Sequence, residues 1–284
     1  MSKKNYYCLV AGLPDLILNG SRMEVDCLHV KHELISQVNR FDRRYLEWLY
    51  RPFDNKNLLN LLLLADSGFD QLGNYSKTYL LQQIIRPTDL ADYLKRFLSQ
   101  FYTEELEQSP LQAENKLQEL FYQEATSSKQ AFIRQWFQFE MDVKNLVTAV
   151  NCYQYEYDIQ THLIADTTGN GIYQELIKGI PKPDALVWED RPQLLQVLQV
   201  FDSVGDATEK EKEIDQIKFQ FLDELIVFNY FTIEQLLSFV LKLQIIERWQ
   251  KLDAQIGLEF LENLIRDLQE KQVFAEEFSL NQKI

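Results

Sequence analysis

The sequence predicts an all-α protein, and three observations support this fold class. The 284 residues include only nine glycines and seven prolines, well below the roughly 12% that these two residues make up in an average chain. Because glycine and proline form tight turns, so low a content argues against turn-rich sandwiches, propellers and barrels. Apolar residues recur at spacings of three and four in most segments, and sustained two-residue alternation is scarce. We therefore expect long helices joined by few connections.

The first part of the chain predicts two substantial helices. Apolar residues at helical spacing run from residue 23 to residue 50, and we expect Pro52 to end this helix. A leucine-dense helix over residues 55–65 is expected next, with a stop at Asp66-Ser67-Gly68. The short apolar run over residues 6–10 could form a strand, but we predict a helix because the surrounding chain is helical.

The middle of the chain predicts the longest helix. Pro87 fits the first turn of a helix that runs to about residue 107, and Ser109-Pro110 restarts the chain for a further helix. Residues 128–157 contain no glycine or proline, and Trp136 and Phe139 fall on one broad apolar face. We expect one continuous helix there.

Loop-like sequence separates this long helix from the last part of the chain. Glycine and proline gather in residues 167–171 and 180–183, which predicts an internal boundary or an exposed interaction loop. Helical periodicity returns in residues 206–224, 233–252 and 255–272.

Charge and cysteine usage narrow the class of protein. The formal net charge of −14 repels phosphate backbones and anionic lipids, so we expect no nucleic-acid partner. The longest apolar run is far shorter than the roughly 20 residues that cross a bilayer, and we expect no signal peptide. Cys8, Cys27 and Cys152 form no C-x-x-C pair, which predicts reduced cytoplasmic thiols.

The familiar catalytic signatures are missing from the sequence. It has no G-x-x-x-x-G-K-[ST] loop, no G-x-G-x-x-G and no G-x-S-x-G. His29 and His32 lie three residues apart with Cys27 nearby, but an H-x-x-H pair alone is weak and nothing obvious completes a metal site. We therefore expect no catalytic residue, no metal and no cofactor. The alternative is an enzyme that uses the region of Cys27, His29 and His32, or a pocket of carboxylates.

A weak internal repeat stands out from this background. Both copies read apolar-Asp-x-Lys-Asn-Leu-apolar: Phe53-Asp54-Asn55-Lys56-Asn57-Leu58-Leu59 and Met141-Asp142-Val143-Lys144-Asn145-Leu146-Val147. A degraded third copy spans residues 246–252, with Glu247 and Gln250 in place of the aspartate and the asparagine. Residues three apart share one helix face, although such pairs often only cap a neighbour or face water. The candidate interaction residues are Asp54, Asn57, Asp142, Asn145, Glu247 and Gln250. The repeat predicts three helical modules, over residues 1–85, 86–180 and 181–284.

An aromatic-rich helix that ends in acidic-x-x-Asn-Leu, repeated in three helical modules, resembles the C/d family of rotor adaptors in archaeal-type and vacuolar-type (V-type) rotary ATPases. The resemblance lies in residues 53–64, 137–150 and 234–252. The opening Tyr6-Tyr7-Cys8-Leu9-Val10-Ala11-Gly12-Leu13-Pro14 is similar to the start of a bacterial family of unassigned biochemistry that is associated with V-type ATPase components. The third copy has Trp249-Gln250 where the adaptor family has an Arg-Asn pair, and the chain is shorter than the usual adaptor.

The resemblance implies a divergent bacterial member with a funnel-like, all-helical body and no chemistry of its own. Its partners would be the central-stalk subunits and the proteolipid rotor ring, and it would meet the membrane only through the ring, on the cytoplasmic side of the inner membrane. The alternative is a generic α-helical protein-interaction scaffold unrelated to ATPases.

Overall fold

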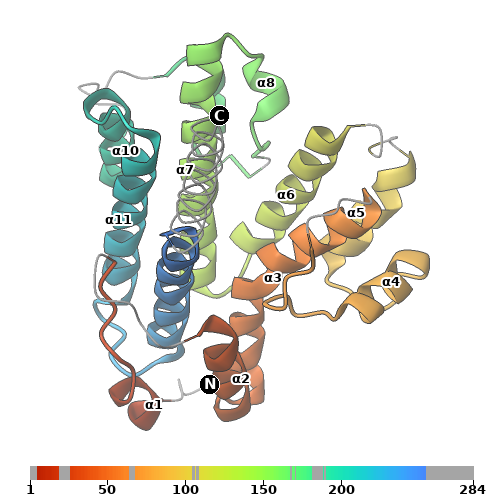
Figure 1. The fold of residues 1–284 in the computed structure, drawn as a ribbon, viewed down its shortest axis with the longest axis vertical. Coiled ribbons are helices and arrows are strands. Elements are labelled where there is room, and N and C mark those ends of the chain that lie inside the picture. Colours follow the sequence, from red (N-terminus) through yellow and green to blue (C-terminus); the bar gives the residue numbers. More distant parts are fainter. Residues whose placement is uncertain are drawn as a thin grey trace, which may run out of the picture.

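The computed structural model describes residues 5–18, 26–63, 68–103, 106, 109–166, 168–169, 171–180, 188 and 190–253. Within these residues the protein is helical and contains no strand, which confirms the all-α class (Figure 1). The helices are α1 (Tyr7–Ala11), α2 (Cys27–Gln37), α3 (Arg40–Leu62), α4 (Lys77–Ile85), α5 (Asp92–Thr103), α6 (Pro110–Thr126), α7 (Ala131–Tyr155), α8 (Ile159–His162), α9 (Tyr173–Lys178), α10 (Pro192–Ser203), α11 (Ala207–Ile226) and a helix over residues 233–253.

The predicted helix stop at Pro52 is wrong. The helical segment predicted from residue 23 to Pro52 is instead interrupted between α2 and α3. There the Asn39 side chain accepts the N–H groups of Phe41 and Asp42 and so caps the start of α3. Pro52 lies inside α3 and removes one helical hydrogen bond. Leu49 and Leu58 are buried on either side of it, and this packing keeps the helix continuous. The leucine-dense segment is thus the second half of α3.

The predicted helix start at Pro87 is also wrong, because Pro87 lies in the turn between α4 and α5. The buried Gln83 side chain fixes this turn by accepting the N–H groups of Thr88 and Asp89, both at 2.9 Å. The residue before a proline avoids helical geometry, and Arg86 is extended, with φ −143°.

The other helix predictions hold for the described residues. Residues 7–11 are helical, Ser109 caps α6 with Pro110 in its first turn, and α7 is the predicted long helix. The segments predicted over 206–224 and 233–252 correspond to α11 and the helix over 233–253. The helix predicted over 255–272 lies outside the described residues. No described helix is both long and apolar enough to span a bilayer.

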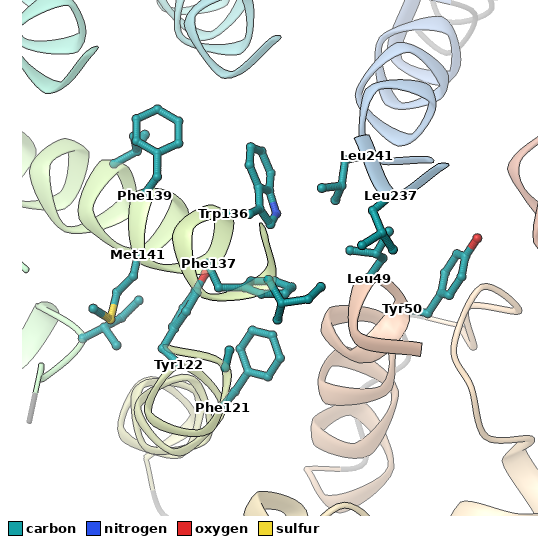
Figure 2. Close-up of a cluster of buried hydrophobic side chains, with 14 of the residues drawn as sticks. Leu49, Tyr50, Phe121, Tyr122, Trp136, Phe137, Phe139, Met141, Leu237 and Leu241 are labelled. Carbon is teal, nitrogen blue, oxygen red and sulfur yellow. The ribbon is translucent and has the colours of Figure 1, made fainter. Parts of the chain in front are cut away.

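Part of the core lies where the three repeat-bearing helices meet. Figure 2 shows Leu237 and Leu241, from the helix over 233–253, facing Leu49 of α3 and Trp136 of α7. All four are buried and belong to one hydrophobic cluster. Leu49 lies five residues before Asp54, and Phe137 lies five residues before Asp142. In α3 and α7 a buried core residue thus lies at the same offset before the aspartate, while the module boundaries remain a prediction.

Candidate functional site

Asn57, in the first copy of the repeat, fastens the loop that follows α3. Its amide is fully buried, donates from Nδ2 to the carbonyl oxygen of Asp70 at 2.8 Å, and accepts the N–H of Asp70 at Oδ1, also at 2.8 Å. The side chain thus satisfies both backbone groups of one loop residue. Such pairing prevents the cost of leaving those groups unpaired away from water.

Asp54 fastens the same loop one helical turn earlier. Its carboxylate accepts the N–H of Tyr75 at 3.1 Å and the Asn74 side-chain amide at 2.6 Å. Gly73 lies directly against the pair, since a Cβ there would be 2.7 Å from Asp54 Oδ1 and 2.9 Å from Asn57 Nδ2. Only glycine lets the loop approach the helix this closely.

A buried cation completes this arrangement from α2. Lys31 donates from Nζ to the carbonyl oxygens of Leu72 at 2.8 Å and Gly73 at 2.6 Å, and lies over the Tyr50 ring. Burial lowers the pKa of Lys31, against the opposing effect of the nearby carboxylates. We call Lys31, Asp54, Asn57 and Gly73 the first lock.

The second copy of the repeat makes the same pair of contacts in α7. Asn145 donates to the carbonyl oxygen of Ile164 and accepts its N–H, both at 2.9 Å. Asp142 accepts the N–H of Ile172 at 3.1 Å and the Gln138 side-chain amide at 3.3 Å. The structure therefore brings the predicted pairs Asp54/Asn57 and Asp142/Asn145 into equivalent roles, although the two pairs lie in different helices.

The second copy also has a glycine pressed against its carboxylate. A Cβ on Gly171 would lie 2.5 Å from Asp142 Oδ1 and 2.7 Å from Asp166 Oδ2. Asp166 accepts the N–H of Gly171 at 2.7 Å and that of Thr168 at 2.8 Å. We call Asp142, Asn145, Asp166 and Gly171 the second lock.

Burial raises the pKa of both repeat carboxyls, because an ionised carboxylate loses its hydration there. The pKa of Asp54 is about 6, since burial outweighs its hydrogen bonds from Asn74 and Tyr75 and the charge of Lys31. The pKa of Asp142 is about 7, with Asp166 adding to the burial effect and the bond from Ile172 and the charge of Arg191 opposing it.

The third copy is arranged differently. Glu247 accepts the N–H of Cys27 at 3.2 Å, at the first residue of α2, and forms an ion pair with Lys251 at 2.6 Å. Gln250 is half-buried, and among the described residues it makes no backbone pair like those of Asn57 and Asn145. The acidic position of the third copy thus joins the helix over 233–253 to the first predicted module.

A hollow of about 1290 Å³ lies among the repeat-bearing helices. α3, α6, α7, α11 and the helix over 233–253 all contribute to its lining. Lys56 and Lys144, the lysines between the aspartate and the asparagine of each repeat, are exposed and line it together with the loop residues Asp70 and Ile164. The first two copies of the repeat therefore turn the carboxylate and the amide inward to a loop, and the lysine outward to the hollow.

The alternative histidine site is not assembled in the described part of the chain. His29 and His32 are exposed on α2, and no group of three or more histidine, cysteine or acidic side chains there could hold a metal ion. Burial next to Glu247 raises the pKa of the Cys27 thiol, which opposes its activation as a nucleophile. Cys8 and Cys152 are also free thiols.

Several lock residues were not predicted from the sequence. Lys31, Asp166 and Gly73 lie outside the repeat, and Gly171 falls in the stretch predicted only to be loop-like. The scarcity of glycine was the available signal, because a glycine in so glycine-poor a chain is more informative than usual.

Comparison with known proteins assigns the chain to a protein family. A family model described as "Protein of unknown function (DUF2764)" matches residues 1–272, so the chain belongs to this family. No curated protein matches the chain, and no solved structure does.

Proposed function

We propose that the protein is the non-catalytic central-rotor adaptor of a V-type rotary ATPase or ATP synthase. In this role it couples the central stalk to the membrane proteolipid ring during ion transport, for example of protons. It acts on the cytoplasmic side and is peripheral to the inner membrane through its complex. It holds no cofactor and performs no reaction of its own.

The observation that carries the proposal is the repetition of one lock in two helices that both line the hollow. A motif repeated with the same buried contacts favours duplicated helical modules. Duplicated modules around a hollow are what the resemblance to the C/d adaptor family implies for a body that receives the tip of a central stalk.

The locks also suit a part that transmits torque. In each lock an asparagine satisfies both backbone groups of a loop residue, and an aspartate accepts a further N–H. Connections fastened in this way resist local opening, because opening must break several buried hydrogen bonds at once. A stiff body passes rotation through its packed surfaces.

Co-purification tests the proposal. The tagged full-length chain, expressed in its own host and extracted from membranes in mild detergent, is expected to recover rotor-ring and central-stalk subunits of a V-type ATPase. Recovery without these subunits, or with unrelated proteins only, would favour the generic scaffold. ATP hydrolysis by the purified chain would overturn the non-catalytic role.

A matched pair of variants locates the contact. Lys56→Trp combined with Lys144→Trp adds bulk to the hollow at two exposed positions, and we expect it to reduce recovery of the stalk subunits. Lys77→Trp places the same side chain at an exposed position of α4 that does not line the hollow. This control should recover the complex normally.

A further inference from the structure

The two locks share a chemical feature that stiffness alone does not require: each uses a carboxyl group where an amide would also accept a backbone N–H. Asp54 is 0% exposed and Asp142 is 3% exposed. No ion pair among the described residues involves either carboxyl. An ionised carboxylate in such a place loses its hydration without a direct countercharge.

Asp54 is surrounded by groups from several segments. Lys31 approaches from α2, while Asp70, Asn74 and Tyr75 lie in the loop. The Asp54 charge also acts on Tyr93 of α5, and Arg51 on the same helix acts on Tyr75 and Tyr93. The Lys31 ammonium is already committed to the carbonyl oxygens of Leu72 and Gly73, so it offsets the charge of Asp54 only from a distance.

Asp142 faces a different set of groups. Gln138 lies on its own helix, Asp166 lies across Gly171, and Arg191 lies at the start of α10. A cavity of about 400 Å³, lined also by Arg134 and Asp190, reaches Asp142. This cavity offers a route for protons between the carboxyl and solvent. The second carboxylate, that of Asp166, further disfavours ionisation of Asp142.

Each carboxyl holds a loop that borders the hollow. Asp54 holds the loop over 68–75 through the N–H of Tyr75, and Asp70 and Leu72 of that loop line the hollow. Asp142 holds the segment around Ile172, and Ile164 of the same connection lines the hollow. A buried carboxylate regains its full hydration when its loop moves away, so its charge and the position of the loop are linked.

We propose that the two locks act as a proton-controlled latch, in which Asp54 and Asp142 hold their loops most firmly when protonated and release them more readily when ionised. The latch concerns the chain itself and does not depend on the rotor role. The raised pKa values, about 6 for Asp54 and about 7 for Asp142, set both responses close to neutral pH. The second lock responds at the higher pH.

Amide hydrogen exchange of the full-length chain, followed by NMR between pH 6 and pH 8, tests the latch. After correction for the base-catalysed intrinsic rate, the opening of the Ile172 N–H should increase about tenfold over this range, and that of the Tyr75 N–H about twofold. These values follow when each open carboxyl has the pKa of an ordinary aspartate. The N–H of Leu146, in the middle of α7, reports global unfolding, and the Ile172 and Tyr75 N–H groups should open more often than it at every pH, which shows that their responses come from local release of the loops.

Isosteric variants separate the latch from a purely structural lock. Asp142→Asn fixes a neutral side chain, so the Ile172 N–H should exchange slowly at every pH, while the Tyr75 response stays as in the wild type. In Asp54→Asn the Tyr75 N–H should exchange slowly at every pH, while the Ile172 response stays as in the wild type. Corrected protection of Ile172 that stays constant from pH 6 to pH 8, or a wild-type response retained in Asp142→Asn, would overturn the proposal.

Discussion

The first and second locks hold their loops with the same two side chains, but their surroundings differ. In the first lock a buried lysine from α2 binds the loop carbonyls, whereas in the second lock another aspartate, Asp166, binds the loop N–H groups. The helical pair is thus the repeated part, and the residue that completes it comes from α2 in the first lock and from the loop in the second. This explains why a short match on the helices is visible in the sequence although the loops are not alike.

The third copy shows what happens when the same position is put to another use. Glu247 is longer than aspartate and accepts the Cys27 N–H at the start of α2 instead of holding a loop of its own. Two copies stabilise their own connections, and the third joins two predicted modules. The following comparisons between paired positions test this division.

The largest effect is expected at the tryptophans in α3 and α7. Trp136 is 3% exposed, so Trp136→Ala should lower the free energy of unfolding by about 3–5 kcal/mol. Trp48 is only half-buried, and Trp48→Ala should cost less. Urea unfolding of both variants measures the difference. A loss below about 1 kcal/mol for Trp136→Ala would show that the core assignment is wrong.

The asparagines come next. Asn145→Ala leaves the N–H and carbonyl oxygen of the buried Ile164 without partners, at an expected cost of about 2–4 kcal/mol. Asn57→Ala should cost about 1–2 kcal/mol, because Asp70 is half-buried and water can replace the amide. Thermal and urea unfolding provide the values. Equal costs, or the opposite order, would contradict the burial argument.

The lock glycines should give a smaller loss. Gly171→Ala places a methyl group within 2.7 Å of three side-chain atoms, and Gly73→Ala places one within 2.9 Å of two. We expect a loss of about 1–3 kcal/mol at Gly171 and less at Gly73, because side chains must shift to admit the methyl group. Urea unfolding measures both, and Gly205→Ala is the control, since a Cβ there meets nothing within 4 Å.

The smallest effect is a dependence of stability on pH. The folded-state pKa values of Asp54 and Asp142 are raised, so the folded protein binds more protons than the unfolded chain and loses stability as pH rises. Between pH 6 and pH 8 the loss should be about 1.4 kcal/mol from Asp142 and about 0.4 kcal/mol from Asp54. Urea unfolding at each pH should show that Asp142→Asn removes the larger part. An unchanged slope in that variant would contradict the assignment.

The sequence predicted the helices and the repeat better than it predicted the contacts. Helical periodicity located α7 and α11 because both bury one face over many turns, and the offset between Asp142 and Asn145 placed them on one side of a helix. The prediction of a helix end failed at Pro52, because packing on both sides of the proline outweighs the missing N–H. The sequence could not locate Lys31 or Asp166, because their roles arise only when distant loops fold back onto the helices.

Photo-crosslinking from the hollow tests the central claim, that this protein is a rotor adaptor, most directly. A photoreactive phenylalanine derivative replaces Lys144 on the wall of the hollow, or Lys77 on α4 as the control, in the full-length chain within its host. We predict crosslinks from position 144 to a central-stalk protein of the rotary ATPase, and none to that protein from position 77. Crosslinks from position 144 that never include a stalk protein, in cells that assemble the ATPase, would contradict the rotor-adaptor role.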